Sequence, residues 1–132
     1  MKLYGIGTDI VNVDRVKKSL TNKKFLKKIF NQEEISKCTN KRYSVNCFAK
    51  RFAAKEAFVK ALGTGISKGI SFNEIIVSNR KSGKPFIKLT GKTKIINDKR
   101  FKKNKTKILL SLSDEKKYAV AFVTITLWIK KI

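Results

Sequence analysis

Residues 3–11 are predicted to form a β-strand, in which successive side chains point to opposite faces. Gly5, Gly7 and Asp9 share one face of this strand with its two end residues. Because glycine has no side chain, this face would let a helix or a second backbone approach closely. The pattern therefore predicts a buried first strand with one acid near its end.

Three short basic and apolar segments follow this strand. Asn12 or Asp14 can cap a helix of about two turns. The basic segment 21–28 continues with apolar anchors around it, and Asn31 can cap a further short helix that contains Glu33 and Glu34. These segments are expected to pack through their apolar residues and to expose their lysines.

The longest predicted helix covers about residues 44–62 and ends at Gly63. At 100° per residue its apolar side chains form one arc, which consists of Phe48, Phe52, Val59 and Leu62. Lys55 lies inside this arc, and Glu56 and Lys60 lie along its edge beside alanines. Charged groups next to a core and to small neighbours indicate a site for an anionic ligand, with or without a metal.

The second half of the chain is predicted to be mainly strands. They cover residues 75–78 and 86–89, and residues 107–113 and 118–129 form a hairpin. A basic helix over about residues 91–103 separates the two pairs, with Ile95, Ile96 and Phe101 directed inward. The expected fold class is α+β, an antiparallel sheet packed on the long helix and on short helices. No repeat or linker divides the chain, so residues 1–132 are expected to form one domain.

The composition is that of a globular but strongly basic protein. The 132 residues are 42% hydrophobic, and 32 Lys and Arg against 9 Asp and Glu give a formal net charge of +23. This charge predicts attraction to acidic partners such as nucleic acid, phosphorylated ligands, anionic membranes or acidic proteins. A solvated lysine surface without any specific partner is the alternative explanation.

The missing residue types exclude several chemistries. The chain has no histidine, which rules out histidine general bases and histidine metal sites, so any metal would be a hard ion such as Mg²⁺ held by carboxylates. Cys38 and Cys47 are expected neither to frame a disulfide scaffold nor to bind zinc, which favours a reducing cytoplasm. No apolar segment is long enough to cross a membrane, and the N-terminus does not resemble a signal peptide.

Asp9 and Glu56 are the acids that best fit a metal site. Two carboxylates can hold one Mg²⁺ and leave its other positions to water and phosphate oxygens. Lys60, with Arg51 or Lys55, would then neutralise the charge on a phosphoryl group during transfer. Two simpler interpretations stay open: Asp9 as a helix cap, and Glu56 with Lys60 as an ordinary surface pair four residues apart.

Two segments resemble the signature sequences of the holo-acyl-carrier-protein synthases, the small type of phosphopantetheinyl transferase. They are residues 5–11 (GIGTDIV) and residues 51–66 (RFAAKEAFVKALGTGI). The similarity continues in Phe30 and Glu34, in residues 82–85 (SGKP), and in residues 111–113 (SLS) followed by 118–121 (YAVA). The resemblance implies an α+β fold, a trimer with active sites shared between subunits, and transfer of 4′-phosphopantetheine from coenzyme A to a serine of apo acyl-carrier protein.

The resemblance also assigns roles to individual residues. Asp9 and Glu56 would hold Mg²⁺, and together with Lys60 they would form the catalytic set. Coenzyme A would be bound by Arg51, Lys55, Lys60, Gly63 and Gly65. The acidic carrier protein would dock on a basic stripe formed by Arg15, Lys18, Lys24 and Lys28.

One position departs from the family pattern. Asp114 stands where the family usually has a histidine that helps to bind coenzyme A. An acid near a phosphate is unfavourable, so a catalytically weakened relative is one alternative. A basic nucleic-acid-binding module without catalysis is the other alternative, and it would need the charge but neither Asp9 nor Glu56.

Overall fold

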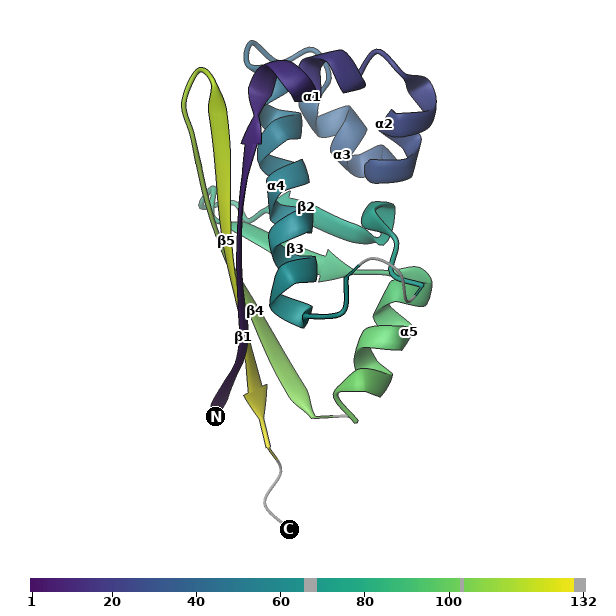
Figure 1. Cartoon of the computed structure of the whole chain (residues 1–132), viewed down its shortest axis with the longest axis vertical. Coiled ribbons are helices and arrows are strands. Elements are labelled where there is room, and N and C mark those ends of the chain that lie inside the picture. Colours follow the sequence, from purple (N-terminus) through teal and green to yellow (C-terminus); the bar gives the residue numbers. More distant parts are fainter. Residues whose placement is uncertain (66–68, 103, 130–132) are drawn as a thin grey trace.

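The structure is a computed structural model that describes residues 1–65, 69–102 and 104–129. It confirms an α+β fold with antiparallel strand pairs around one long helix (Figure 1). Helix α4 (Ser44–Leu62) lies in the middle, with a three-stranded sheet along one side and the short helices at its upper end. The described residues at both ends of the chain lie at the opposite, lower end.

The larger sheet has the strand order β1–β5–β4 and is antiparallel throughout. Strands β1 (Lys2–Asn12), β4 (Lys105–Asp114) and β5 (Tyr118–Trp128) match the strands predicted over residues 3–11, 107–113 and 118–129. In the register of this sheet, Asp9 is opposite Ala121, and Asp114 is opposite Ala119. Both acids therefore lie toward the end of the sheet where β1 leads into the short helices.

Strand β1 packs directly against helix α4 because of its two glycines. A Cβ atom added at Gly5 would overlap the carbonyl oxygen of Ala61, and one added at Gly7 would overlap that of Ala57. The close approach predicted from the glycines is thus confirmed. It brings the backbone of β1 onto the same helix turns that carry Glu56 and Lys60.

Helix α4 is buried on most of its circumference, because elements pack on several of its sides. Its alanines, including Ala49, Ala53, Ala54 and Ala57, have no exposed surface. Small side chains suit a helix that has neighbours on all sides, since they allow close packing. Gly63 ends the helix in the left-handed conformation with φ of 79°, as predicted.

The short helices are α1 (Val13–Ser19), α2 (Lys23–Ile29) and α3 (Gln32–Cys38). Each begins at an asparagine whose side chain accepts backbone N–H bonds: Asn12, Asn22 and Asn31. Helix α3 also has a complete capping box with Glu34. The three helices cover a second apolar cluster against the start of α4.

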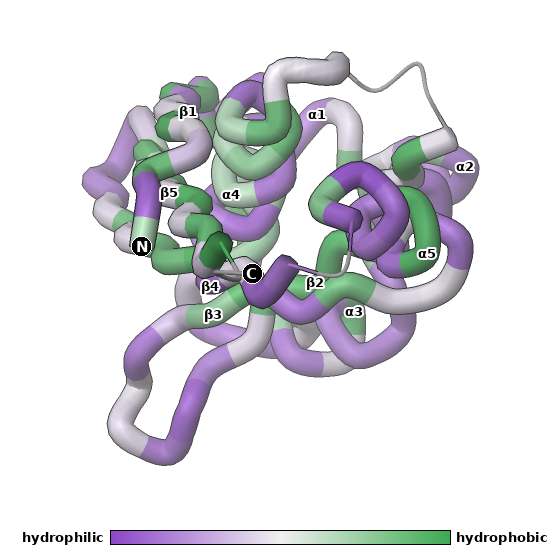
Figure 2. Tube along the Cα trace, turned by 90° about the horizontal axis from the view of Figure 1, so that it is seen from below, coloured by the Kyte–Doolittle hydropathy of each residue, from purple (hydrophilic) through white to green (hydrophobic). Residues whose placement is uncertain are grey.

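A two-stranded antiparallel sheet of β2 (Ile75–Asn79) and β3 (Pro85–Leu89) follows the 3₁₀ turn η1 (Phe72–Glu74). The turn between β2 and β3 is a hydrophilic loop that extends beyond the body of the molecule (Figure 2). Helix α5 (Gly91–Arg100) comes next. Phe101 is buried and Ile96 partly buried as predicted, but Ile95 is 56% exposed, so its inward direction was wrong. Lys103, the expected helix end, is outside the described residues.

Two further expectations from the sequence have an outcome in the structure. Among the described residues, no helix is long and apolar enough to cross a membrane. Cys38 and Cys47 are joined by a disulfide, with their Cα atoms 5.4 Å apart. The sequence predicted no disulfide scaffold and did not indicate this single bridge, which forms because the chain between α3 and α4 turns back and brings the two helix ends together.

Candidate active site

Asp9 and Lys60 form the centre of the candidate site. The Lys60 ammonium donates to the Asp9 carboxylate and to the carbonyl oxygen of Thr8, both at 3.0 Å. The side chain of Asp9 is 14% exposed, whereas that of Lys60 is 55% exposed. The ion pair of Lys60 is thus made across the β1–α4 contact. The alternative role of Asp9 as a helix cap does not hold, because Asn12 caps α1.

Glu56 lies one turn before Lys60 on α4 and is half-buried. Its carboxyl pKa is raised, first by burial and then by the negative charge of Asp9, while Lys60 acts in the opposite direction. The charge of Asp9 acts on Glu56 because β1 packs on this face of the helix. Strand and helix therefore bring together two acids that are far apart in the sequence.

This donor set fits a hard divalent cation that uses few protein ligands. Among the described residues, no group of three or more His, Cys, Asp or Glu side chains could hold a metal. Two carboxylates are a common protein contribution to a Mg²⁺ site, where water and substrate phosphates supply the other oxygens. A cation between Asp9 and Glu56 would also remove the repulsion that helps to raise the Glu56 pKa.

Lys55 does not belong to this site. Its ammonium is 0% exposed and donates to Glu34 at 2.7 Å and to the carbonyl oxygens of Phe72 and Ile75. Burial lowers the pKa of Lys55 to about 8, although Glu34 opposes this shift. The prediction that Lys55 contacts coenzyme A was wrong, because the apolar arc that contains it faces the core.

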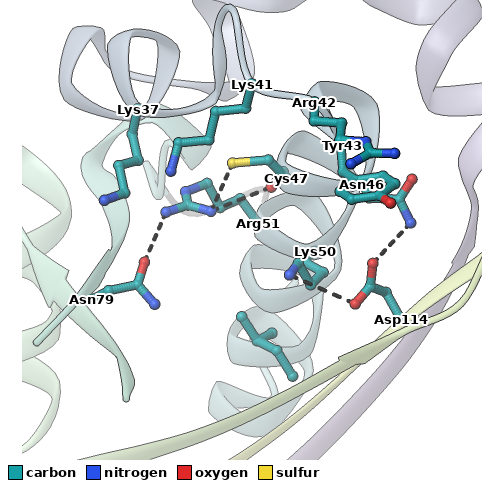
Figure 3. A pocket seen from close by; sticks show the side chains of 11 residues that line it. Lys37, Lys41, Arg42, Tyr43, Asn46, Cys47, Lys50, Arg51, Asn79 and Asp114 are labelled. Atoms are coloured by element: carbon teal, nitrogen blue, oxygen red, sulfur yellow. Dashed lines mark hydrogen bonds and ion pairs between the residues drawn. The ribbon is translucent and has the colours of Figure 1, made fainter. Parts of the chain in front are cut away.

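Arg51 lies one turn before Lys55, under a basic pocket of about 550 Å³ (Figure 3). Its guanidinium donates to the side chain of Asn79 at 3.1 Å and to the carbonyl oxygen and sulfur of Cys47. The Nε atom is buried, and no described residue gives it a hydrogen-bond partner. The pocket is lined by five cationic side chains, Lys37, Lys41, Arg42, Lys50 and Arg51. Their charge would suit a phosphorylated ligand.

Asp114 is the acid that lines this pocket. It accepts a hydrogen bond from Asn46 at 2.8 Å and lies 3.6 Å from the Lys50 ammonium (Figure 3). The acid at the family's histidine position therefore has a cation and an amide as neighbours. These contacts reduce the repulsion that an incoming phosphate would meet.

The other predicted residues lie on the surface. Gly63 and Gly65 have positive φ angles, and at either position an added Cβ would meet no atom of the described residues within 4 Å. The end of the second signature segment, Ile66, is outside the described residues. The predicted carrier-binding residues are exposed, with Arg15 and Lys18 on α1 and Lys24 and Lys28 on α2.

One family of known proteins matches most of the chain. The family model described as "4'-phosphopantetheinyl transferase superfamily" matches residues 5–123. The chain belongs to this superfamily. The matched range contains Asp9, Glu56 and Lys60, as well as the basic pocket.

Relatives within the superfamily cover nearly the whole chain. The holo-[acyl-carrier-protein] synthase of Pelagibacter ubique (strain HTCC1062) is 50% identical over 126 residues, which is 93% of this chain and 96% of that protein. The enzyme of the same name from Ehrlichia chaffeensis (strain Arkansas) is 50% identical over 129 residues, with the same coverage.

Solved structures of the superfamily share the fold. The holo-[acyl-carrier-protein] synthase of Neisseria meningitidis has a TM-score of 0.81 and 36% identity, covering 94% of this chain and 98% of that one. The enzyme from Bacillus anthracis (strain Ames), described as a complex with CoA (3',5'-ADP), has a TM-score of 0.77 and 34% identity, covering 95% and 97%.

Sequence reasoning missed two features of the site region. Glu34 was predicted to lie in a short helix and to match the family pattern, but not to pair with Lys55, yet it is 1% exposed and neutralises this lysine. A lysine inside an apolar arc was the available signal, because a buried charge needs a partner. Asn79 was not singled out, and no local pattern marks it as a partner of Arg51.

Proposed function

We propose that this protein transfers 4′-phosphopantetheine from coenzyme A to a serine of an apo acyl-carrier protein and releases adenosine 3′,5′-bisphosphate. One observation carries the proposal: in a member of the superfamily, Asp9, Glu56 and Lys60 meet where β1 packs on α4. The names of the relatives support the reaction, and the complex with coenzyme A supports the substrate.

Asp9 and Glu56 would hold Mg²⁺ against the diphosphate of coenzyme A. The bound cation would neutralise phosphate charge and orient the diphosphate. Lys60 would add a positive charge to the same phosphates, and its 3.0 Å pair with Asp9 keeps it at this position. The two carboxylates and one exposed ammonium are the residues that we assign to catalysis.

The reaction would be a nucleophilic substitution at the β-phosphorus of coenzyme A. The serine oxygen of the carrier protein forms a new bond to this phosphorus, and the bond to the oxygen that bridges the two phosphates breaks. The bridging oxygen leaves with the nucleotide. The serine proton passes to a carboxylate or to water at the site. Charge stabilisation and positioning would supply most of the acceleration.

The nucleotide end of coenzyme A would occupy the basic pocket above Arg51. Two observations support an anionic ligand there: the buried Nε of Arg51 has no partner within the described part of the chain, and four other cations line the pocket. Gly63 and Gly65 would border the ligand, since both lie on the exposed exit of α4.

The acidic carrier protein would dock on α1 and α2. Arg15 and Phe25 line one hollow, and Phe25 and Lys28 line a neighbouring one. Lys18 and Lys24 extend the positive surface. Charged pairs across this contact would mainly steer encounter and orientation.

A homotrimer is also part of this proposal. The face of the β1–β5–β4 sheet that points away from α4 has exposed apolar side chains, which are Ile6, Ile10, Leu109 and Phe122. They are between 40% and 63% exposed in the single chain. Contact with two further copies would remove this apolar surface from water.

We further propose a cytoplasmic location and a role in fatty acid biosynthesis. No nucleic-acid partner is proposed, because such a module would leave Asp9 and Glu56 unused.

A mass-shift assay tests the function. The protein is incubated with coenzyme A, an apo acyl-carrier protein and Mg²⁺, with or without EDTA, and the carrier is analysed by intact mass spectrometry. We expect the carrier to gain one phosphopantetheine group only when the cation is available. Asp9→Asn and Glu56→Gln should abolish this gain, whereas Asp98→Asn, an exposed change on α5, should not. Full turnover in both site variants would contradict the assignment.

A further inference from the structure

The disulfide between Cys38 and Cys47 connects two elements of the basic pocket. Cys38 is the last residue of α3, and Cys47 lies in the first turn of α4. The connector between the helices carries Lys41 and Arg42, and both line the pocket. The cross-link thus closes a short loop whose side chains form one wall of a charged site.

The two sulfurs have different surroundings. Cys38 is 0% exposed and belongs to the apolar cluster beneath the short helices. Cys47 is half-buried and lines the pocket, where its sulfur accepts an N–H bond from Arg51 at 3.3 Å (Figure 3). A small molecule that enters the pocket would therefore reach Cys47 and not Cys38.

The surroundings of Cys47 favour a reactive thiol. Positive charges next to a cysteine stabilise its thiolate, which is the form that attacks disulfides. Cys47 has the Arg51 guanidinium in direct contact, and Lys41, Arg42 and Lys50 line the same pocket. Burial in an apolar cluster has the opposite effect on Cys38. This difference separates an attacking cysteine from a resolving one.

We propose that Cys38 and Cys47 are a reversible redox pair that exchanges with low-molecular-weight thiols and disulfides and adjusts the affinity of the basic pocket for its anionic ligand. The Cys47 thiolate attacks a small disulfide and releases one small thiol. Cys38 then loses its proton, attacks the mixed disulfide at Cys47 and releases the second small thiol. Two protein thiols are oxidised, and one small disulfide is reduced to two thiols. Two small thiols reverse the sequence: the first attacks the protein disulfide and forms the mixed disulfide at Cys47, and the second attacks this mixed disulfide and releases one small disulfide.

The redox state would act on the pocket through Arg51. In the oxidised protein Cys47 carries no charge, and the connector with Lys41 and Arg42 is tied to α4. In the reduced protein a Cys47 thiolate would pair with Arg51 and compete with a bound phosphate. The freed connector would also have more conformations to lose on binding. The oxidised form should therefore bind the anion more tightly.

The first experiment measures the cross-link itself. The folded full chain is treated with excess oxidised or reduced glutathione, then unfolded in denaturant, blocked with iodoacetamide and analysed by intact mass. We expect no alkylated cysteine after oxidation and two after reduction. In Cys38→Ser, Cys47 should accumulate one glutathione, whereas in Cys47→Ser the buried Cys38 should carry no glutathione. Two free thiols after oxidation, or an adduct mainly on Cys38, would overturn the redox pair.

The second experiment measures the effect on the pocket and rests on the proposed function. Its probe is adenosine 3′,5′-bisphosphate, which has no thiol that could exchange with the protein. Isothermal titration should give a dissociation constant about two- to fivefold lower for the oxidised protein, the size expected for one charge contact. The double variant Cys38→Ser with Cys47→Ala should show no redox dependence and serves as the control.

The outcomes separate the two proposals. Equal affinity in both redox states, with the cross-link demonstrated by mass, would overturn the coupling to the pocket but not the function. Absence of bisphosphate binding in every state would overturn both the coupling and the nucleotide pocket, while the mass measurement would still decide the cross-link.

Discussion

Lys55 and Glu34 form an ion pair at 2.7 Å in which neither side chain is exposed to solvent. Lys55 also donates to the carbonyl oxygens of Phe72 and Ile75, and Glu34 accepts the backbone N–H of Val77. One pair thus joins α3, α4, η1 and β2. Since Arg51 is one helical turn from Lys55 and bonds to Asn79 of β2, the same pair also fixes the base of the basic pocket.

Glu34→Gln should strongly destabilise the protein, because it leaves the Lys55 ammonium buried without a counter-charge. We expect the free energy of unfolding to fall by about 3 to 5 kcal/mol, as measured by urea denaturation. Adding Lys55→Met to this variant should recover part of the loss. In the exposed pair of Lys94 and Asp98, Asp98→Asn should cost less than about 1 kcal/mol. Equal losses at the two sites would contradict the role of burial.

The same lysine predicts a pH dependence. Its pKa is about 8 in the folded protein because burial disfavours the charged form, and it is 10.5 without that burial. Between these pH values the unfolded chain holds a proton that the folded chain lacks, so the free energy of unfolding rises with pH. The free energy of unfolding of the wild type minus that of Lys55→Met should be constant below about pH 8. This difference should then increase by about 3 kcal/mol up to pH 10.5. A difference that stays flat would show that the pKa of Lys55 is not lowered.

Gly7→Ala tests the contact between β1 and α4. An added Cβ would overlap the Ala57 carbonyl oxygen, so the strand must move away from the helix. We expect a loss of about 1 to 3 kcal/mol in unfolding free energy. Turnover should also fall, because Asp9 lies two residues further along the same strand. Lys81→Ala, at an exposed position of the turn between β2 and β3, should leave both quantities nearly unchanged.

Lys60→Met tests the charge at the site. The side chain is 55% exposed, so its loss should hardly affect stability. Turnover should drop about 10²- to 10³-fold if Lys60 stabilises phosphoryl charge in the transition state. Lys99→Met, on α5, changes the net charge equally and should retain full activity. A similar loss in both variants would point to overall charge instead of a local role.

Asp114→Asn tests the departure from the family pattern. Removing the carboxylate would free Lys50, now 3.6 Å away, to interact with an anion in the pocket. The dissociation constant for coenzyme A should fall several-fold, which corresponds to about 1 kcal/mol. Glu115→Gln, in the adjacent turn, is the matched control. Weaker binding by Asp114→Asn would mean that this acid orients Asn46 and Lys50 for the ligand.

Much of the fold could be predicted because it depends on local patterns. Alternation located β1, runs of strand-forming residues located β4 and β5, and asparagine caps marked the starts of α1 and α3. Gly5 and Gly7 predicted a close neighbour, since glycine in a strand has few other uses. Ile95 was placed incorrectly because an apolar residue on a helix does not show which side of the helix meets a neighbour.

The site could be predicted only in part. The sequence marks Asp9 and Glu56 as candidate metal ligands and Lys60 as a candidate phosphate contact. The structure brings these three side chains together where β1 packs on α4. The sequence assigns Lys55 to the same site because helical periodicity shows on which side of the helix the lysine lies, but not which residue it pairs with. The choice between a ligand contact and a buried pair depended on Glu34, which is 21 residues away in the sequence.

The sequence by itself determined the elements, the excess of positive charge and the residue types available for chemistry, because these follow from composition and from periodicities of two and 3.6 residues. Tertiary structure alone decided which charges became buried partners, how Cys38 met Cys47, and which cations surround Arg51. The reason is physical: burial and electrostatic interaction depend on distances in space, and contacts between distant segments set those distances.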